Sequence, residues 1–332
     1  MTILVTGGAG YIGSHMVHEL TDAGEPVVVL DNLSTGFRYL IPAAVPFVAG
    51  STGDRTLVAE IIARHNITAI IHFAASIVVP ESVADPLAYY GNNTMNTCAL
   101  LDVAIKAGVQ HLIFSSTAAV YGETSDAPVL ENAPTVPISP YGTSKLMSEI
   151  MIHDAAKAHG LRFVILRYFN VAGADPKLRT GQATPAATHL IKVACETAVG
   201  KRQKMNVFGT DYPTPDGTCI RDYIHVSDLV QAHSVALAHL RSGGANATFN
   251  CGYGRGSSVL EVINAVRRAS GRDFPVEISG RRPGDAPALV ANVDRIHATL
   301  PWRPRFQNLD TIVSHALAWE KQLANRRKSA VA

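Results

Sequence analysis

A glycine-rich turn near the N-terminus constrains the fold of this 332-residue chain more than any other feature. The stretch TGGAGYIG places Gly7, Gly10 and Gly13 in G-x-x-G-x-x-G spacing, and it also fits G-x-G-x-x-G if Gly8 is taken as the first glycine. It follows the β-rich run TILV and opens a segment with helical spacing. Glycines permit a tight turn and a close approach of the backbone to a pyrophosphate, and the helix N-terminus offers N–H groups and a positive dipole end. This context favours a dinucleotide-binding turn over a merely structural one.

An acidic residue completes the pattern. The second apolar run, EPVVVLD, ends in Asp31, whose carboxylate can accept hydrogen bonds from the hydroxyls of an adenosine ribose. A carboxylate at this position would repel a 2′-phosphate. The sequence therefore predicts NAD, rather than NADP, as the cofactor.

Apolar runs alternate with helical segments over the first half of the chain. The later runs are ITAIIHFAA, VQHLIFSST and LRFVILRYFN, and helices are expected near 87–107 and over 141–159. Strands that are apolar throughout and separated by helices indicate a parallel sheet covered on both faces. Right-handed crossovers then give an α/β fold with a doubly wound, Rossmann-type sheet.

The character of the chain changes after Asn170. The stretches ADPKLRTGQATPAA and GTDYPTPDGT predict long loops, and loops on a rigid scaffold often carry function. We therefore expect an NAD-binding domain over 1–170 and a smaller, loop-rich α/β substrate domain over 171–332. The boundary is soft because later strands can rejoin the first sheet.

Composition excludes several classes of partner. The formal net charge of +2 offers no long basic stripe for nucleic acid. No apolar run approaches the roughly 20 residues that span a bilayer, and a strand is expected directly after Met1, which argues against a signal peptide. We expect a cytoplasmic protein that binds neither nucleic acid nor membrane.

Cysteine and histidine spacing gives no sign of a metal site. His15 and His18 share a helix face, but no third ligand is evident, so packing is the better interpretation. The cysteines have no paired spacing and are expected to be reduced thiols. They are Cys98, Cys195, Cys219 and Cys251.

The stretch SPYGTSKLMSE carries the candidate chemistry. Tyr141 and Lys145 are four residues apart and lie on one face of the expected helix. A free tyrosine has a pKa of about 10, but a nearby ammonium and an oxidised nicotinamide ring both favour the phenolate. Such a pair is often only surface decoration. After a dinucleotide turn, and after Thr117 at the end of a strand in FSSTAAVYG, it predicts a base that removes a proton from an alcohol.

These residues resemble the extended short-chain dehydrogenase/reductase family and, within it, the UDP-hexose 4-epimerases. The resemblance covers nearly the whole chain, and its most specific parts are LRYFNVAGA and FGTDYPTPDGTCIRDYIHV. The other matching stretches are GGAGYIGSH, LDNLSTG, IIHFAA, PLAYYGNN, FSSTAAVYG, SPYGTSKLMSE and RRPGDAPAL.

The resemblance implies an isomerase of carbohydrate metabolism, including galactose metabolism, that interconverts UDP-glucose and UDP-galactose through a 4-keto sugar. NAD is tightly held, Tyr141 takes the proton of the sugar O4, Thr117 lies beside O4, and Lys145 binds the nicotinamide ribose. It also implies a homodimer that pairs the helices near 87–107 and over 141–159 across a two-fold axis.

Matching positions give two sets of binding residues. The cofactor set is Gly7, Gly10, Tyr11, Ile12, Gly13, Asp31, Asn32, Ser51, Thr52, Phe73, Ala74, Ala75, Asn92, Tyr141, Lys145 and Phe169. The substrate set is Thr117, Tyr141, Asn170, His189, Asn206, Phe208, Arg221, Arg282, Asp285 and Leu289. Two guanidinium groups suit a diphosphate because each can donate two parallel hydrogen bonds. Leu289 is expected on the far wall of the sugar pocket, where a tyrosine goes with rejection of N-acetylated sugars in relatives and a small residue with their acceptance.

The chain departs from the family pattern at a few positions. Ser51 stands where an acid near the adenine is common, His189 replaces a common asparagine, and Ile77 replaces a lysine of some relatives. Ala118-Ala119 stand where dehydratases carry Asp-Glu, and the glutamate of sugar decarboxylases is absent from this stretch too. No acid is therefore placed there to expel a hydroxyl.

Three alternatives remain open at this point. One is a 4-epimerase of another UDP-sugar, namely an N-acetylhexosamine, a pentose or a uronate. Another is a net NAD-dependent oxidoreductase acting on a nucleotide sugar. The third is a non-catalytic dinucleotide sensor, against which the intact Tyr141, Lys145 and Thr117 argue.

Overall fold

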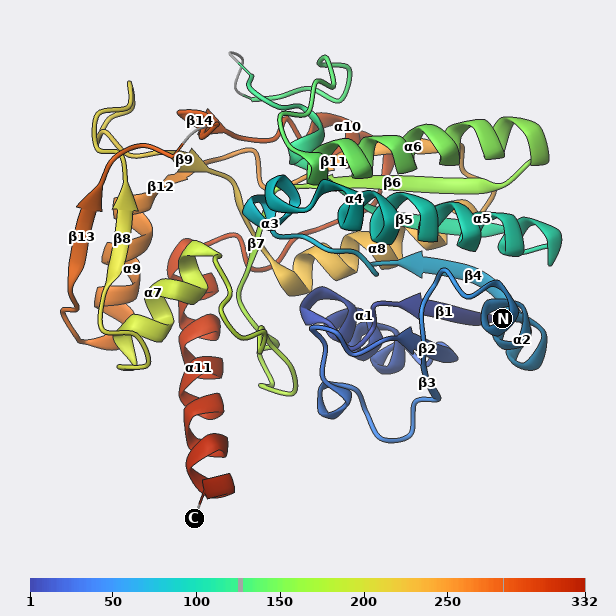
Figure 1. Cartoon of the computed structure of the whole chain (residues 1–332), viewed down its shortest axis with the longest axis horizontal. Helices are drawn as coiled ribbons and strands as arrows, with labels where there is room; N and C mark the ends of the chain where they lie inside the picture. The colour runs from blue at the N-terminus through green and yellow to red at the C-terminus, as the bar shows by residue number, and fades with distance from the viewer. Residues whose placement is uncertain (125–127, 283, 332) are drawn as a thin grey trace.

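A seven-stranded, all-parallel sheet forms the larger lobe of the molecule (Figure 1). The computed structural model describes residues 1–124, 128–282 and 284–331, with side chains up to residue 325. The strand order of the sheet is β11-β6-β5-β4-β1-β2-β3. Strands β2 and β3 are added on one side of β1, and the strands from β4 onward are added on its other side. This order confirms the predicted doubly wound α/β fold. The strands are β1 (Thr2–Thr6), β2 (Val27–Asp31), β3 (Phe47–Ala49), β4 (Ile67–His72), β5 (His111–Thr117), β6 (Arg162–Tyr168) and β11 (Ala247–Cys251).

Helices cover both faces of this sheet, as fully apolar strands require. One face packs against α1 (Tyr11–Asp22) and α8 (Val226–Arg241) in a core that includes Trp302. The other face packs against α2 (Arg55–His65), α5 (Asn96–Lys106) and α6 (Pro140–His159). Apolar side chains thereby fill most of both faces of the sheet.

The helix expected near 87–107 is divided in the structure. A short helix, α4 (Pro86–Tyr89), runs into a π-helical stretch, η2 (Tyr90–Met95), and then into α5. The buried Asn93 lies in η2, and its amide bonds the Ser76 carbonyl at 2.9 Å and the Ser144 hydroxyl at 3.0 Å. A π-helical turn of this kind is frequent at functional sites, and here it lies against the helix that carries Tyr141.

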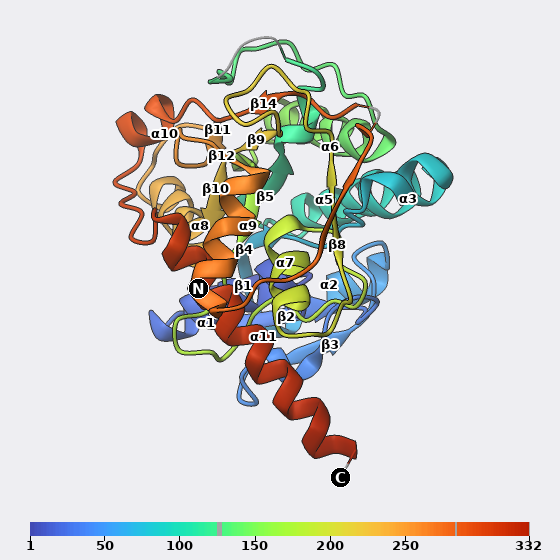
Figure 2. The same ribbon diagram turned by 90° about the vertical axis from the view of Figure 1, so that its left-hand side faces the viewer.

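The smaller lobe is built mostly from the second half of the chain. The helices α7 (Leu190–Ala198), α9 (Val259–Ser270) and α11 (Leu309–Val331) enclose a separate core behind the parallel pair β8 (Met205–Phe208) and β13 (Val276–Ser279). The far end of α11 extends away from both lobes (Figure 2).

Short elements connect the two lobes. Two small sheets, β10-β7 and β12-β9-β14, lie between the large sheet and the β8-β13 pair in Figure 1. Segments beyond residue 170, including α8 and β11, pack on or join the large sheet. The division at residue 170 therefore separates stretches of sequence, while strands from both sides of it share one sheet.

The remaining elements are short. They are η1 (Arg38–Leu40), α3 (Val79–Ala84), η3 (Ala118–Val120), β7 (Asn170–Ala172), β9 (Ile220–Arg221), β10 (Tyr223–His225), β12 (Ser257–Ser258), β14 (Ala288–Leu289) and α10 (Asp294–Thr299). Within the described ranges no helix is both long and apolar enough to cross a bilayer. The four cysteines are free thiols.

Candidate active site

The glycine turn brings the start of α1 against the chain that follows β4. Gly7 has φ +68°, and a Cβ there would lie 2.6 Å from the backbone nitrogen of Ala74. A Cβ on Gly13 would lie 2.1 Å from the carbonyl oxygen of Gly7. Gly7 is required because of its positive φ and the close Ala74 backbone. Gly13 is required because a side chain there would collide with the backbone of the same turn.

The N-terminus of α1 is open to a ligand anion. Gly10 is the N-cap residue, and a glycine has no side chain with which to cap the helix. The backbone N–H groups of the first turn and the helix dipole are thus available to a pyrophosphate. These features fit the NAD that the sequence predicts.

Asp31 has a second role that sequence reasoning missed. Its carboxylate accepts hydrogen bonds from the backbone N–H groups of Ala9, at 2.9 Å, and Leu33, at 2.7 Å. The carboxylate thereby braces the glycine turn, and it can also accept a hydrogen bond from a ribose hydroxyl. Burial raises the pKa of Asp31, while these backbone N–H groups oppose the shift. The spacing between the turn and Asp31 is visible in the sequence. The hydrogen bonds that brace the turn could not be predicted from that spacing, because they form only in the folded turn.

The predicted cofactor residues gather at the carboxyl ends of successive strands. Asn32 follows β2, Ser51 and Thr52 follow β3, the stretch Phe73 to Ala75 follows β4, and Phe169 follows β6. Because parallel strands end at a common edge, these side chains lie along the crevice where such sheets bind ligands. Tyr11 and Ile12 begin α1, and Asn92 lies in η2.

Individual contacts in this set differ in character. The Tyr11 hydroxyl donates to the Gly173 carbonyl at 2.7 Å, and the Asn92 amide donates to the Ser76 hydroxyl at 2.9 Å. Asn32 is exposed at the rim. The set therefore combines partly buried side chains that hold the fold with an exposed side chain that a ligand can reach.

The three predicted catalytic residues meet where β5 ends and α6 begins. Ser139 caps α6 by accepting from the Gly142 N–H at 3.2 Å, which places Tyr141 in the first turn and Lys145 one turn later, both buried. Thr117 is the last residue of β5 and its side chain hydrogen-bonds Tyr141.

The direction of the Thr117 hydrogen bond is set once Tyr141 is a phenolate, because a phenolate oxygen can only accept. The Thr117 Oγ1 accepts the backbone N–H of Ala119 at 3.1 Å. The hydroxyl proton is then free to be donated to the Tyr141 oxygen. A donor to this oxygen stabilises the phenolate, and the contact accordingly lowers the pKa of Tyr141.

Burial works against both members of the pair. It raises the pKa of Tyr141, with the Thr117 hydrogen bond opposing, and it lowers the pKa of Lys145 to about 7, with the carboxylate of Glu149 opposing. The Lys145 ammonium lies 4.6 Å from the centre of the Phe114 ring, which provides partial compensation. Sequence reasoning anticipated the attraction between the two groups and missed the cost of burying them.

A buried ion pair lies one turn beyond Lys145. Glu149 and Arg167 are joined at 2.6 Å between Oε2 and Nη2, and Glu149 also accepts a short hydrogen bond from Ser116, next to Thr117. The pair ties α6 to β5 and β6, so it fixes the position of Tyr141 relative to Thr117. Glu149 was visible in the motif SPYGTSKLMSE, but nothing in the sequence pointed to Arg167 as its partner.

Four predicted UDP residues lie close together, on β8, on β9 and in the loop before β14. Asp285 accepts from Arg282 Nε at 2.9 Å and lies 3.5 Å from Arg221 Nη2. The Arg282 guanidinium lies 4.6 Å from the centre of the Phe208 ring. This arrangement presents two cations and an aromatic face close together, which suits a nucleotide diphosphate.

The other predicted substrate residues are more dispersed. Asn170 and His189 line one small cavity of about 20 Å³. Leu289 packs against the core cluster that contains Phe169 and Ala118. Asn206 is exposed on β8.

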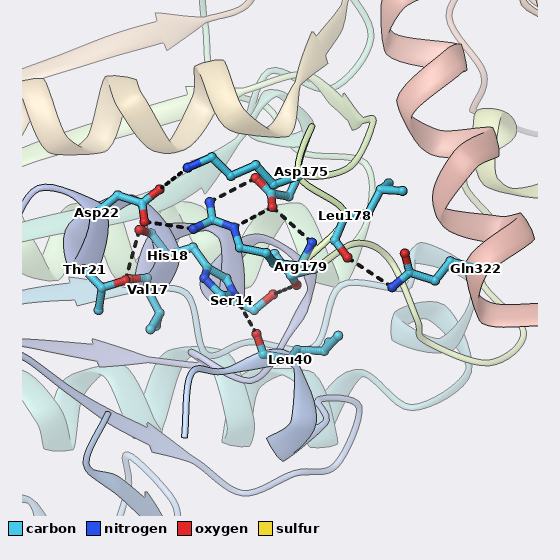
Figure 3. Close-up of polar contacts among 12 residues, drawn as sticks. Ser14, Val17, His18, Thr21, Asp22, Leu40, Asp175, Leu178, Arg179 and Gln322 are labelled. Carbon is cyan, nitrogen blue, oxygen red and sulfur yellow. Dashed lines mark hydrogen bonds and ion pairs between the residues drawn. The ribbon is translucent and has the colours of Figure 1, made fainter. Parts of the chain in front are cut away.

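The two histidines of α1 bond backbone carbonyls. The His15 Nδ1 lies 2.7 Å from the backbone carbonyl oxygen of Tyr11. The His18 Nε2 lies 3.1 Å from the backbone carbonyl oxygen of Leu40 (Figure 3). Over the part of the chain that the structure describes, no group of three or more His, Cys, Asp or Glu side chains is placed to hold a metal ion.

Fold and site together define an enzyme of nucleotide-linked redox chemistry, and comparison with known proteins agrees. Residues 3–252 match the model of the NAD dependent epimerase/dehydratase family, and the chain belongs to this family. The chain is 60% identical, over 97% of its length and 92% of the relative, to a UDP-glucose 4-epimerase of Azospirillum brasilense.

Solved structures give the same result. A UDP-glucose 4-epimerase from Brucella ovis, in complex with NAD, superimposes with a TM-score of 0.93 at 44% identity, covering 96% of this chain and 97% of that one. The enzyme from Bifidobacterium longum, in complex with NAD+ and UDP, gives a TM-score of 0.93 at 37% identity, covering 98% and 99%. The prediction of an NAD-dependent epimerase is confirmed.

Proposed function

We infer that the protein is an isomerase that interconverts UDP-glucose and UDP-galactose with NAD as its resident cofactor. The observation that carries this inference is the convergence of Thr117, Tyr141 and Lys145 at the sheet edge that also carries the glycine turn. The relatives described above are named UDP-glucose 4-epimerases, and their similarity to this protein extends over nearly the whole chain.

Tyr141 is the proton acceptor. As phenolate it removes the proton of the sugar O4, and Thr117 donates a hydrogen bond that stabilises the charge on the phenolic oxygen. Its position in the first turn of α6 adds the favourable end of the helix dipole. When bound, NAD supplies the hydride acceptor and donor for C4.

Lys145 supplies positive charge in a site where burial disfavours it. Because its pKa is about 7, the ammonium and the neutral amine of Lys145 are both populated near neutral pH. The ammonium stabilises the Tyr141 phenolate, and we propose that it also donates to the nicotinamide ribose. Both tasks depend on the position of α6 against the sheet, which the Glu149–Arg167 pair holds.

The smaller lobe holds the UDP part and leaves the sugar free to turn. We propose that Arg221 and Arg282 bind the diphosphate, with Asp285 orienting both guanidinium groups. Leu289 offers no hydrogen bond to the sugar. A 4-keto sugar can then present its other face to the cofactor while the nucleotide stays anchored.

Substrate choice is tested by presenting four UDP-sugars separately to purified protein without added NAD. They are UDP-galactose, UDP-N-acetylgalactosamine, UDP-arabinopyranose and UDP-galacturonate. We expect the highest kcat/KM with UDP-galactose. A higher value with another of the four would assign the enzyme to that sugar, and a strict requirement for added NAD would favour a net oxidoreductase.

We propose a homodimer in the cytoplasm. The outer faces of α3, α4 and α6 expose large apolar side chains: Val83 is 63% exposed, Leu87 78% and Ile150 53%. A symmetric contact between these helices would bury them. A monomeric mass by light scattering at micromolar concentration would contradict this assembly.

A further inference from the structure

The segment from Gly173 to Gln182 links α1, whose N-terminus is proposed to bind NAD, to the predicted UDP site. It leaves β7 beside Tyr11 and ends seven residues before His189, which begins α7 as its N-cap residue. The start of α1 and His189, both predicted to bind ligand groups, therefore lie at the two ends of one connection.

The segment is anchored on α1 by several polar contacts (Figure 3). The hydroxyls of Ser14 and Thr180 are 2.6 Å apart, and both residues are fully buried. Arg179 bonds Asp175 in its own loop at 2.7 Å and Asp22 on α1 at 2.8 Å. These contacts hold the segment against the helix whose N-terminus is proposed to bind the pyrophosphate of NAD.

Its last residue is held from the opposite side. The backbone carbonyl of Gln182 accepts from Lys192 Nζ at 2.7 Å and from Trp319 Nε1 at 3.2 Å. Lys192 in turn forms a buried, short ion pair with Glu320 on α11. A Cβ on Gly181 would lie 2.5 Å from the Trp319 ring, so the chain lies directly against the indole. These contacts hold the backbone of Gln182 in position independently of its side chain.

The side chain of Gln182 determines which ring nitrogen of His189 carries the hydrogen. The amide nitrogen of Gln182 lies 2.9 Å from Nδ1 of His189. An amide NH₂ donates and has no lone pair to offer, so Nδ1 must be the unprotonated nitrogen. The hydrogen of the neutral imidazole is then on Nε2. Burial lowers the pKa of His189, which favours this neutral form.

We propose that Gln182 is a positioning residue of the UDP site, which holds His189 as the Nε2–H tautomer so that this N–H can donate to the UDP diphosphate. The inference rests on the proposed function and on the contact between His189 and UDP that the family resemblance implies. His189 shares a cavity with Asn170, another residue of the predicted substrate set. An imidazole fixed in this tautomer is a neutral donor, as an asparagine amide would be.

The test uses the NAD-containing enzyme and a double-mutant cycle between the two residues. UDP affinity is measured by calorimetry for the wild type, Gln182→Leu, His189→Asn and the double variant. Loss of an oriented donor is expected to weaken UDP binding about tenfold in Gln182→Leu, which corresponds to about 1.4 kcal/mol. In the His189→Asn background the same change is expected to have little effect, because the amide needs no tautomer to be chosen.

A spectroscopic signal distinguishes this role from simple packing. In protein with ¹⁵N-labelled histidine, the His189 resonances are identified by their absence from His189→Asn. We expect the shifts of an Nε2–H tautomer in the wild type and a change toward protonated Nδ1 in Gln182→Glu, where the carboxylate accepts a hydrogen bond. The matched control is Gln322→Ala, since Gln322 bonds the Leu178 carbonyl at the outer side of the same segment and is expected to leave UDP affinity unchanged.

The outcomes separate the two claims. Wild-type enzyme that fails to bind UDP would contradict the proposed function itself. Wild-type enzyme that binds UDP, with effects of Gln182→Leu that are the same in both backgrounds or with unchanged His189 shifts in Gln182→Glu, would overturn the positioning role alone. If Gln182→Leu does not fold, the near-isosteric Gln182→Glu provides the decision through the same shifts.

Discussion

Replacing Thr117 with valine isolates the hydrogen bond that supports the catalytic phenolate. Valine keeps the shape of threonine and removes the hydroxyl, so the buried end of β5 is expected to keep its packing. Two contacts are lost, namely the bond donated to Tyr141 and the one accepted from Ala119 N–H. The first acts on the base, and the second acts on the short turn that follows the strand.

The size of the effect follows from the charge on the acceptor. A hydrogen bond to a charged group is worth about 1.5–3 kcal/mol, and about 1.4 kcal/mol corresponds to one pKa unit. The Thr117 contact lowers the pKa of Tyr141, so its loss raises that pKa. Because Tyr141 must be deprotonated to act, the acid limb of the profile of kcat/KM against pH should move up by about 1–2 pH units. At a fixed pH below this limb the rate should fall by about 10- to 100-fold.

The assay is the conversion of UDP-galactose across a series of pH values, with Thr117→Ser as the matched control. Serine keeps the hydroxyl, so its acid limb should stay near that of the wild type. An acid limb in Thr117→Val at the wild-type position would show that Thr117 does not support the phenolate, whatever the change in absolute rate.

Three further substitutions test the remaining parts of the site. Tyr141→Phe should keep the fold and the bound NAD and lose most turnover, and near-normal kcat in this variant would rule out Tyr141 as the base. Lys145→Ala removes the ammonium whose pKa is about 7 and should raise the pH at which residual activity appears; an unchanged profile would count against coupling to Tyr141. Leu289 is intermediate in size between tyrosine and serine, so we expect weak activity on N-acetylated UDP-sugars. Leu289→Tyr should remove this weak activity and spare that on UDP-galactose, while Leu289→Ser should increase it; a constant ratio of kcat/KM for the two substrates would show that Leu289 is not the gate.

The parts of the fold that follow local rules were predictable from the sequence. The turn at Gly7 and Gly13 could be located because only glycine fits its conformation and contacts, and that requirement is visible in the residue spacing. Strand β3 was missed because its three residues, Phe47–Ala49, are too few to show a pattern. The π-helical stretch at Asn93 was missed because it depends on contacts with Ser76 and Ser144, which lie far away in the sequence.

The same distinction applies to the site. Tyr141 and Lys145 were recognisable because they are one helical turn apart in a single motif. The Arg167 partner of Glu149 and the Gln182 partner of His189 depend on packing between elements. The balance of charge at Tyr141 also depends on burial, which no local spacing reports.

The most direct test of the account follows the hydrogen on C4 of the sugar. UDP-galactose carrying deuterium at C4 is converted by the purified protein in ordinary water, with unlabelled NAD added to the solution, and the UDP-glucose formed is analysed by mass spectrometry and NMR. If Tyr141 acts as the base beside a resident cofactor, the deuterium should be retained at C4 of the product, with inverted configuration. Loss of the label to water or to the added NAD would contradict the claim that this site removes and returns the same hydrogen within one turnover.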